Sequence, residues 1–135
     1  MANKDASFGL KPVKMIGGAP YSGGQSRYRI AANYGTAIFQ GVMQVTGGGV
    51  EIHAVGGTVP LIGVFNGCSY TDPTSGEQVF SNYYPASTNA SDIIANIIDD
   101  PSVVFEIQAD EAFPIADLLG NFDTIKTNSG STKTG

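Results

Sequence analysis

The chain has 135 residues and a net charge of −5, with 14% charged and 41% hydrophobic residues. This length suffices for one domain with a hydrophobic core and is too short for two ordinary domains. The low charge, together with 10% aromatic residues, excludes an intrinsically disordered chain, and no apolar run has the length of a membrane-spanning helix. Eighteen glycines among many Thr, Val, Ile and Tyr residues favour an all-β fold that is rich in turns.

The first 25 residues are predicted to form an extended N-terminal arm (residues 1–25). The stretch SFGLKPVKMIGGAPYSGGQS combines two prolines with two Gly-Gly pairs and shows neither helical nor strand periodicity. Ordering its backbone would cost roughly 20 kcal/mol, at about 1 kcal/mol per residue. Its larger apolar side chains would return about 2 kcal/mol each if fully buried. We therefore expect a partner surface to order the arm.

From residue 26 onward the pattern becomes that of short strands. We expect a β-domain over residues 26–125 and a flexible polar tail over residues 126–135. Alternating apolar residues predict strands in RYRIA, TAIFQGVMQVT, VEIHAV and SVVFEIQAD, with Gly41 as a bulge or bend. IIANIIDDP has helical spacing, but its four β-branched isoleucines favour a strand. AFPIADLLGNFDTI predicts a helical turn followed by a short strand. The expected fold is a small antiparallel β-barrel or sandwich of about seven short strands.

The segment LIGVFNGCSYTDPTSGEQVFSNYYP predicts a β-hairpin. Asp72-Pro73 opens a turn that Gly76 closes, so Leu61–Tyr70 should pair with Glu77–Tyr84. If Tyr70 lies opposite Glu77, both faces of the hairpin are apolar, and one of them needs cover from a neighbour or from the C-terminal segment. The first face contains Ile62, Val64, Cys68 and Tyr70, and the second contains Leu61, Phe65, Phe80 and Tyr84.

The charges are unevenly distributed along the chain. All seven basic residues lie near the two ends, whereas residues 30–125 contain eleven acidic residues and neither Lys nor Arg. A protein with an acidic body binds nucleic acid poorly, because neutralising the phosphates requires a broad basic surface. Basic ends on an acidic body favour association between copies, or folding of the ends onto their own body.

The sequence predicts no catalytic apparatus, no metal site and no cofactor. A nucleophilic Cys68 would need the single histidine, His53, beside it, whereas a cysteine among apolar strand residues is more typical of the core. These two residues alone cannot form a zinc site, and the acidic pairs lack the spacing of a calcium-binding loop. The single cysteine, and the absence of an apolar signal core in MANKDASFGLKPVK, predict synthesis in a reducing cytoplasm.

Four stretches of the chain resemble a group of virion proteins. MANKDASFGLKPV, IAANYGTAIFQG, LIGVFNGCSYTDP with FSNYYPAS, and DDPSVVFEIQAD are similar to small head decoration, or cement, proteins of marine and freshwater tailed bacteriophages. This resemblance implies a non-enzymatic structural protein, made in the bacterial host, that binds the outer surface of the assembled head. The implied partners are the major capsid protein and further copies of the chain, in a dimer or trimer, with no nucleic acid and no membrane.

On this reading, two groups of residues contact a partner. An extended arm can add a strand to a neighbour's sheet, and aromatic side chains are favoured in interface cores. The arm group consists of the anchors Phe8, Leu10, Val13 and Ile16 and the basic residues Lys11, Lys14, Arg27 and Arg29. The hairpin group consists of Phe65, Phe80, Tyr83 and Tyr84. The simpler alternative for both groups is packing on their own domain.

Two other functions are compatible with the sequence. The first is a structural component of the tail or of the head–tail junction. The second is a carbohydrate-binding β module for host-surface glycans, with Tyr70, Tyr83 and Tyr84 as stacking platforms.

Overall fold

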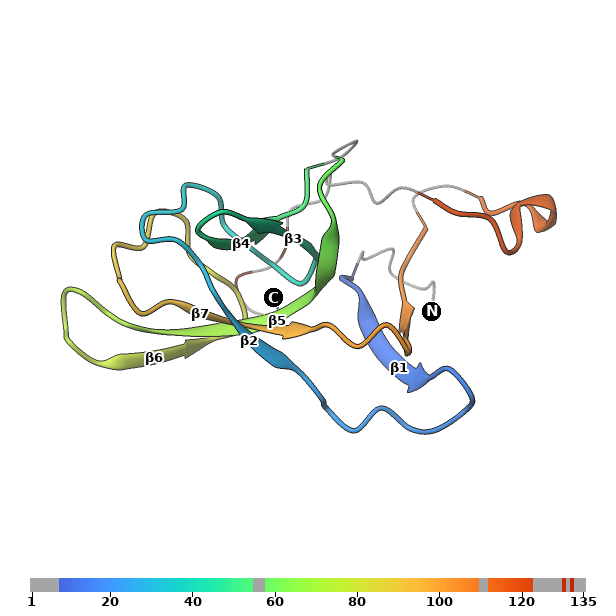
Figure 1. The fold of residues 1–135 in the computed structure, drawn as a ribbon, viewed down its shortest axis with the longest axis horizontal. Helices are drawn as coiled ribbons and strands as arrows, with labels where there is room; N and C mark the ends of the chain where they lie inside the picture. The colour runs from blue at the N-terminus through green and yellow to red at the C-terminus, as the bar shows by residue number, and fades with distance from the viewer. Residues whose placement is uncertain (1–7, 55–57, 110–111, 123–129, 131, 133–135) are drawn as a thin grey trace, which may run out of the picture.

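The computed structural model describes residues 8–54, 58–109, 112–122, 130 and 132. Over these residues the fold is all-β, with eight antiparallel strands in two sheets (Figure 1), so the predicted fold class is confirmed. Within the same residues, no helix is long and apolar enough to cross a membrane. The larger sheet contains β2 (Ser26–Arg29), β3 (Val42–Thr46), β4 (Gly49–Ile52), β5 (Leu61–Thr71), β6 (Gln78–Ser81) and β7 (Ile94–Ile98). The smaller sheet is a ribbon of β1 (Lys11–Met15) and β8 (Val103–Glu106).

Strand β5 organises the larger sheet. It pairs with β3 through its first residues, with β7 through its middle and with β6 through its last residues. Its register against β7 shifts between Phe65 and Cys68, and Gly67 within this interval has a φ of 100°. A bulge of this kind bends a strand and redirects its side chains. As a result, Phe65 and Cys68 belong to the same buried core although they are three residues apart.

The turn of the hairpin forms as predicted, but the register of its strands differs. The Asp72 backbone N–H donates to the Glu77 carbonyl at 2.8 Å, and Gly76 has the positive φ, 75°, that a closing glycine permits. Tyr70 lies opposite Val79, where we predicted Glu77. The strands are therefore offset by two residues from the prediction.

The predicted second face of the hairpin is wrong. Phe65 and Tyr84 are fully buried in the core of the domain, whereas Phe80 is 75% exposed. Strict alternation placed these three side chains together, but the bulge moves Phe65 to the core side. Tyr84 lies beyond the end of β6 and forms an isolated bridge with Ile38.

The larger sheet curls until its edge strands β2 and β4 approach each other (Figure 1). The two strands are in close contact at Gly49, which has a φ of 141° and whose Cβ, if present, would overlap the carbonyl oxygen of Arg29. No ladder joins β2 to β4 among the described strands, so the curl does not form a closed barrel. Its buried core consists of Ile30, Ile38, Met43, Val50, Phe65, Cys68, Tyr70, Tyr84, Ala90, Ile93, Ala95 and Ile97.

Residues 11–15 of the predicted arm are ordered by their own chain, whereas we expected a partner surface to order them. These residues form β1 and pair with β8 of the same chain, with Lys11 opposite Glu106 and Met15 opposite Val103. Local periodicity gave no strand signal because Pro12 and two lysines interrupt it. The partner strand also lies near the other end of the chain. The simpler alternative, an arm that rests on its own chain, therefore holds for this part of the arm.

The C-terminal segment contains the predicted helical turn, a 3₁₀ turn over Ile115–Asp117. The strand predicted after it does not occur within residues 118–122, and residues 123–125 lie outside the described part of the chain. The predicted tail also lies outside it, apart from Gly130 and Thr132, as do arm residues 1–7.

Gly49→Ala is expected to lower the free energy of unfolding by about 2 kcal/mol or more, because the new side chain overlaps β2 at a backbone conformation that disfavours it. Urea unfolding followed by circular dichroism measures this change. Gly47→Ala is the matched control, since a Cβ at that position meets nothing within 4 Å. Equal midpoints for the two variants would contradict the contact between β2 and β4.

Candidate interaction surfaces

The β1–β8 ribbon exposes an apolar and basic surface. Val13 is 42% and Ile16 is 70% exposed, and Lys11 and Lys14 are also exposed. Among the described strands, none pairs with the outer edge of β1, although its end contacts the following turn through a bridge between Lys14 and Pro20 and a 2.8 Å hydrogen bond from the Met15 N–H to the Ala19 carbonyl. An edge strand presents unpaired backbone N–H and C=O groups to another chain. The ribbon therefore offers both backbone and side-chain contacts.

The start of the arm contacts the larger sheet at one loop. A Cβ on Gly9 would overlap the carbonyl oxygen of Gln40, so the two backbones lie in close contact. Phe8, Lys11 and Glu106 complete the lining of a shallow pocket of about 300 Å³ at this junction. Phe8 is 44% exposed and Leu10 is half-buried, so these two predicted anchors are partly covered by their own chain.

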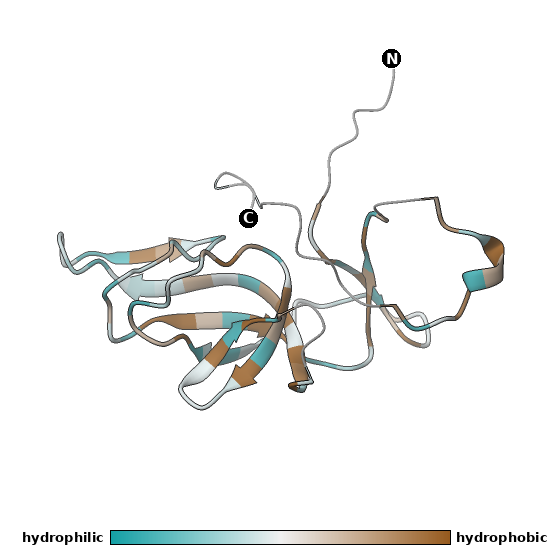
Figure 2. Cartoon of the chain, turned by 90° about the horizontal axis from the view of Figure 1, so that it is seen from above, coloured by the Kyte–Doolittle hydropathy of each residue, from teal (hydrophilic) through white to brown (hydrophobic). Residues whose placement is uncertain are grey.

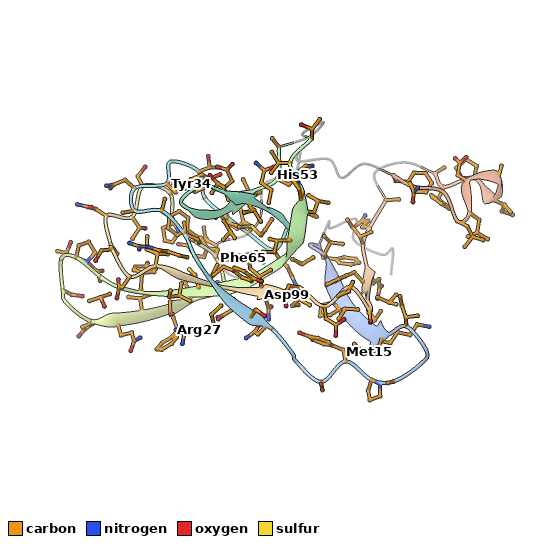
Figure 3. All side chains as sticks on the ribbon, viewed as in Figure 1. Met15, Arg27, Tyr34, His53, Phe65 and Asp99 are labelled. Atoms are coloured by element: carbon orange, nitrogen blue, oxygen red, sulfur yellow. The ribbon has the colours of Figure 1, made fainter. Side chains whose placement is uncertain are left out.

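The four predicted basic residues divide between two surfaces. Lys11 and Lys14 lie on the ribbon, whereas Arg27 and Arg29 lie on β2 of the larger sheet (Figure 3). Alternation along β2 leaves both arginines exposed, and the Arg29 guanidinium donates to the Ser91 carbonyl at 3.0 Å. We grouped the two arginines with the arm because they follow it directly in the sequence.

Asp99 ties β2 to the end of β7. Its carboxylate accepts hydrogen bonds from the Ser26 hydroxyl at 3.0 Å and from the Tyr28 hydroxyl at 2.8 Å. The bonds from Tyr28 and Ser26 hold the pKa of Asp99 below its usual value, and the bond to Asp99 raises the pKa of Tyr28. The neighbouring Asp100 accepts from the Ser102 backbone N–H at 2.8 Å. This acidic pair therefore has a structural role, and the described residues contain no cluster of three potential metal ligands.

Of the four predicted hairpin residues, only Phe80 has a largely open side chain. Tyr83 is half-buried and stacks on Phe39, with ring centroids 5.6 Å apart and an interplanar angle of 12°. The proposed platform of three tyrosines for a glycan is wrong, because Tyr70 and Tyr84 belong to the buried core.

The interpretation of Cys68 as a core residue is confirmed. Its thiol is buried and donates to the carbonyl oxygen of Tyr83 at 3.4 Å. Burial raises the pKa of Cys68 to about 11, which opposes formation of a nucleophilic thiolate. His53 has a different partner, since its Nδ1 lies 3.0 Å from the amide oxygen of Gln44.

Sequence reasoning missed one apolar surface, which we call the apolar lobe (residues 112–122). It carries Ile115, Leu118 and Leu119, which are 89%, 66% and 97% exposed. Figure 2 shows the hydrophobic colour of this segment, at the opposite end of the molecule from the β5–β6 turn. The signal in the sequence was a high density of large apolar residues in a segment with no strand pattern.

Comparisons of the chain with protein-family models, with curated proteins and with solved structures give no match. The resemblance to phage virion proteins therefore stays a prediction.

Acidification is expected to weaken the fold through Asp99. Hydrogen bonds from Tyr28 and Ser26 lower the pKa of Asp99 in the folded state. The ionised carboxylate therefore stabilises the fold above its ordinary pKa of 3.8, and this stabilisation is lost as the pH falls below that value. Asp99→Asn should therefore flatten the acid limb of a plot of unfolding midpoint against pH. Asp117→Asn, at an exposed aspartate of the 3₁₀ turn, is the control. An unchanged acid limb in Asp99→Asn would contradict this role.

Alkaline pH is expected to weaken the fold through Cys68. In the folded state the pKa of Cys68 is about 11, above its ordinary value of 9.0. Burial of the neutral thiol therefore stabilises the fold fully below pH 9.0, and this stabilisation is lost as the pH rises towards 11. Cys68→Ala should flatten the alkaline limb of the same plot. At about pH 8, a thiol reagent should label the wild-type chain only after it is unfolded in urea. Rapid labelling of the native chain would contradict the burial of the thiol.

Proposed function

We propose that this protein is a non-enzymatic capsid decoration protein, which binds the outer surface of an assembled phage head and stabilises contacts between capsomers. The resemblance of four stretches to virion proteins supports this role. The observation that carries it is the β1–β8 ribbon, an element outside the larger sheet with a partly open strand edge and exposed anchors.

The ribbon has the properties that binding to the surface of a protein shell requires. Its open edge can add to a strand of the major capsid protein through main-chain hydrogen bonds. Val13 and Ile16 provide apolar anchors beside that edge, and Lys11 and Lys14 favour an acidic partner surface.

The pairing of β1 with β8 changes the energetics of this role. We expected a partner to supply the whole cost of ordering the arm. In the structure residues 11–15 are already extended and paired, so binding at these residues orders less backbone. The proposal therefore rests on the exposed groups of the ribbon and no longer on an arm that cannot order itself.

The double variant Val13→Ser with Ile16→Ser is expected to weaken binding to head shells by roughly tenfold or more, because both anchors lose their apolar groups. Both side chains are exposed, so the unfolding midpoint should change little. Cosedimentation with isolated shells that lack this protein measures the binding. Val45→Ser, at a position that is 47% exposed on β3, is the matched control.

Saturation of shells by the double variant at wild-type concentrations would contradict the role of the ribbon. Imaging of intact particles separates the head from the tail. Decoration predicts many copies over the head surface, whereas a component of the tail or head–tail junction would be present in few copies.

A further inference from the structure

The dipeptide Asn66-Gly67 lies in an interval of β5 that no neighbouring strand pairs. Strand β3 pairs with β5 up to Val64, β6 begins its pairing at Cys68, and the register against β7 passes directly from Phe65 to Cys68. Residues 66 and 67 therefore have no partner in any of the three registers of this strand. A bulge interrupts the ladder that holds a strand extended. The dipeptide thus lacks the restraint that the paired parts of β5 have.

Asn66 combines an accessible amide with a following glycine. Its side chain is exposed, and its Nδ2 donates to the Gln25 Oε1 at 3.0 Å. It is the only asparagine of the chain that is followed by glycine. Because glycine has no Cβ, its backbone nitrogen can approach the side-chain carbonyl carbon of the preceding residue with little steric hindrance. Gly67 already has a φ of 100°, which residues with a Cβ rarely adopt.

We propose that Asn66 is a site of spontaneous covalent modification in the folded protein, which converts its amide to aspartate and isoaspartate through a succinimide. The Gly67 backbone nitrogen attacks the Asn66 Cγ, so that an N–Cγ bond forms and the Cγ–Nδ2 bond breaks. The Nδ2 leaves as ammonia and takes with it the proton of the Gly67 N–H. Water then opens the ring at Cγ to give aspartate, or at the backbone carbonyl of residue 66 to give isoaspartate. Neither step is a redox step, and water is the only co-reactant.

The two products have different consequences for β5. Isoaspartate adds one atom to the backbone at the bulge, where space is limited because a Cβ on Gly67 would come within 2.9 Å of the Ser81 carbonyl oxygen. Aspartate keeps the length of the backbone, and the Gln25 amide can turn to donate its nitrogen to the new carboxylate. We therefore expect isoaspartate to lower the unfolding midpoint and Asn66→Asp to change it little.

Incubation of the full chain at mildly alkaline pH, followed by peptide mass spectrometry, tests the proposal. Asn66 should lose its amide at least about tenfold faster than Asn33 and Asn89, because attack depends on close approach of the reacting atoms. These two asparagines are matched internal controls, since both are exposed and hydrogen bonded to each other at 3.2 Å, and tyrosine or alanine follows them. An isoaspartyl methyltransferase detects the isoaspartate product. Asn66→Gln, which keeps an amide but needs a larger ring, should give no such signal at this position.

A parallel incubation in urea measures the reactivity of the unfolded chain. The rate at Asn66 in the native chain should stay within about tenfold of the rate in urea, because the bulge leaves the dipeptide unpaired. Stronger protection in the native chain, or a rate at Asn66 no higher than at Asn33 and Asn89, would overturn the proposal. An unfolding midpoint that stays constant as isoaspartate accumulates would overturn the effect on β5. The modification does not involve the ribbon, so loss of the shell-binding function proposed above would leave this site unaffected.

Discussion

The bulge in β5 between Phe65 and Cys68 is the constraint on which the rest of the structure depends. Its extra residue lets one strand pair with β3 at its start and with β6 at its end along one edge, while β7 occupies the other edge. The bend is possible because Gly67 has a φ of 100°, and a Cβ there would come within 2.9 Å of the Ser81 carbonyl. A second register shift, between β3 and β5 at Met43–Gln44, accompanies it, and the sheet curls so that β2 approaches β4 at Gly49. A straight β5 would leave Phe65 outside the core.

The ribbon is the part of the fold that is least supported by this arrangement. After Ile98 the chain leaves the larger sheet through Asp99 and Pro101, and β8 then pairs only with β1 among the described strands. Two strands alone are marginally stable in water, and the smaller sheet buries few large side chains. Elements of low local stability are commonly those that bind partners, because they open at little cost. A shell protein that pairs with the edge of β1 would therefore stabilise the element that most needs support.

Sequence patterns over a few residues predicted most of the strands and the main turn of this fold. The features that they did not predict depend on contacts between residues far apart in the chain. Alternation and β-branched residues located the strands of the larger sheet, and Asp72 with Gly76 located the turn. Alternation assumes that every residue advances the pattern by one face, so the bulge at Gly67 moved Phe65 from its predicted face into the core. Tyr84 is buried for another reason, because it lies beyond the end of β6 and bridges to Ile38. Strand β1 was missed because its partner comes from the other end of the chain. The tie between Tyr28 and Asp99 joins residues 71 positions apart and has no local signature.

The ribbon and the apolar lobe both expose apolar side chains, but they differ in charge. The ribbon surface combines Val13 and Ile16 with two lysines, so its attraction to the acidic body of another copy or to an acidic shell is electrostatic in part. The lobe has no cation and one carboxylate in its described residues, and its aliphatic side chains are exposed. Salt therefore distinguishes the two surfaces: contacts made by the lysines weaken as salt screens them, whereas burial of the lobe's apolar side chains does not depend on attraction between charges.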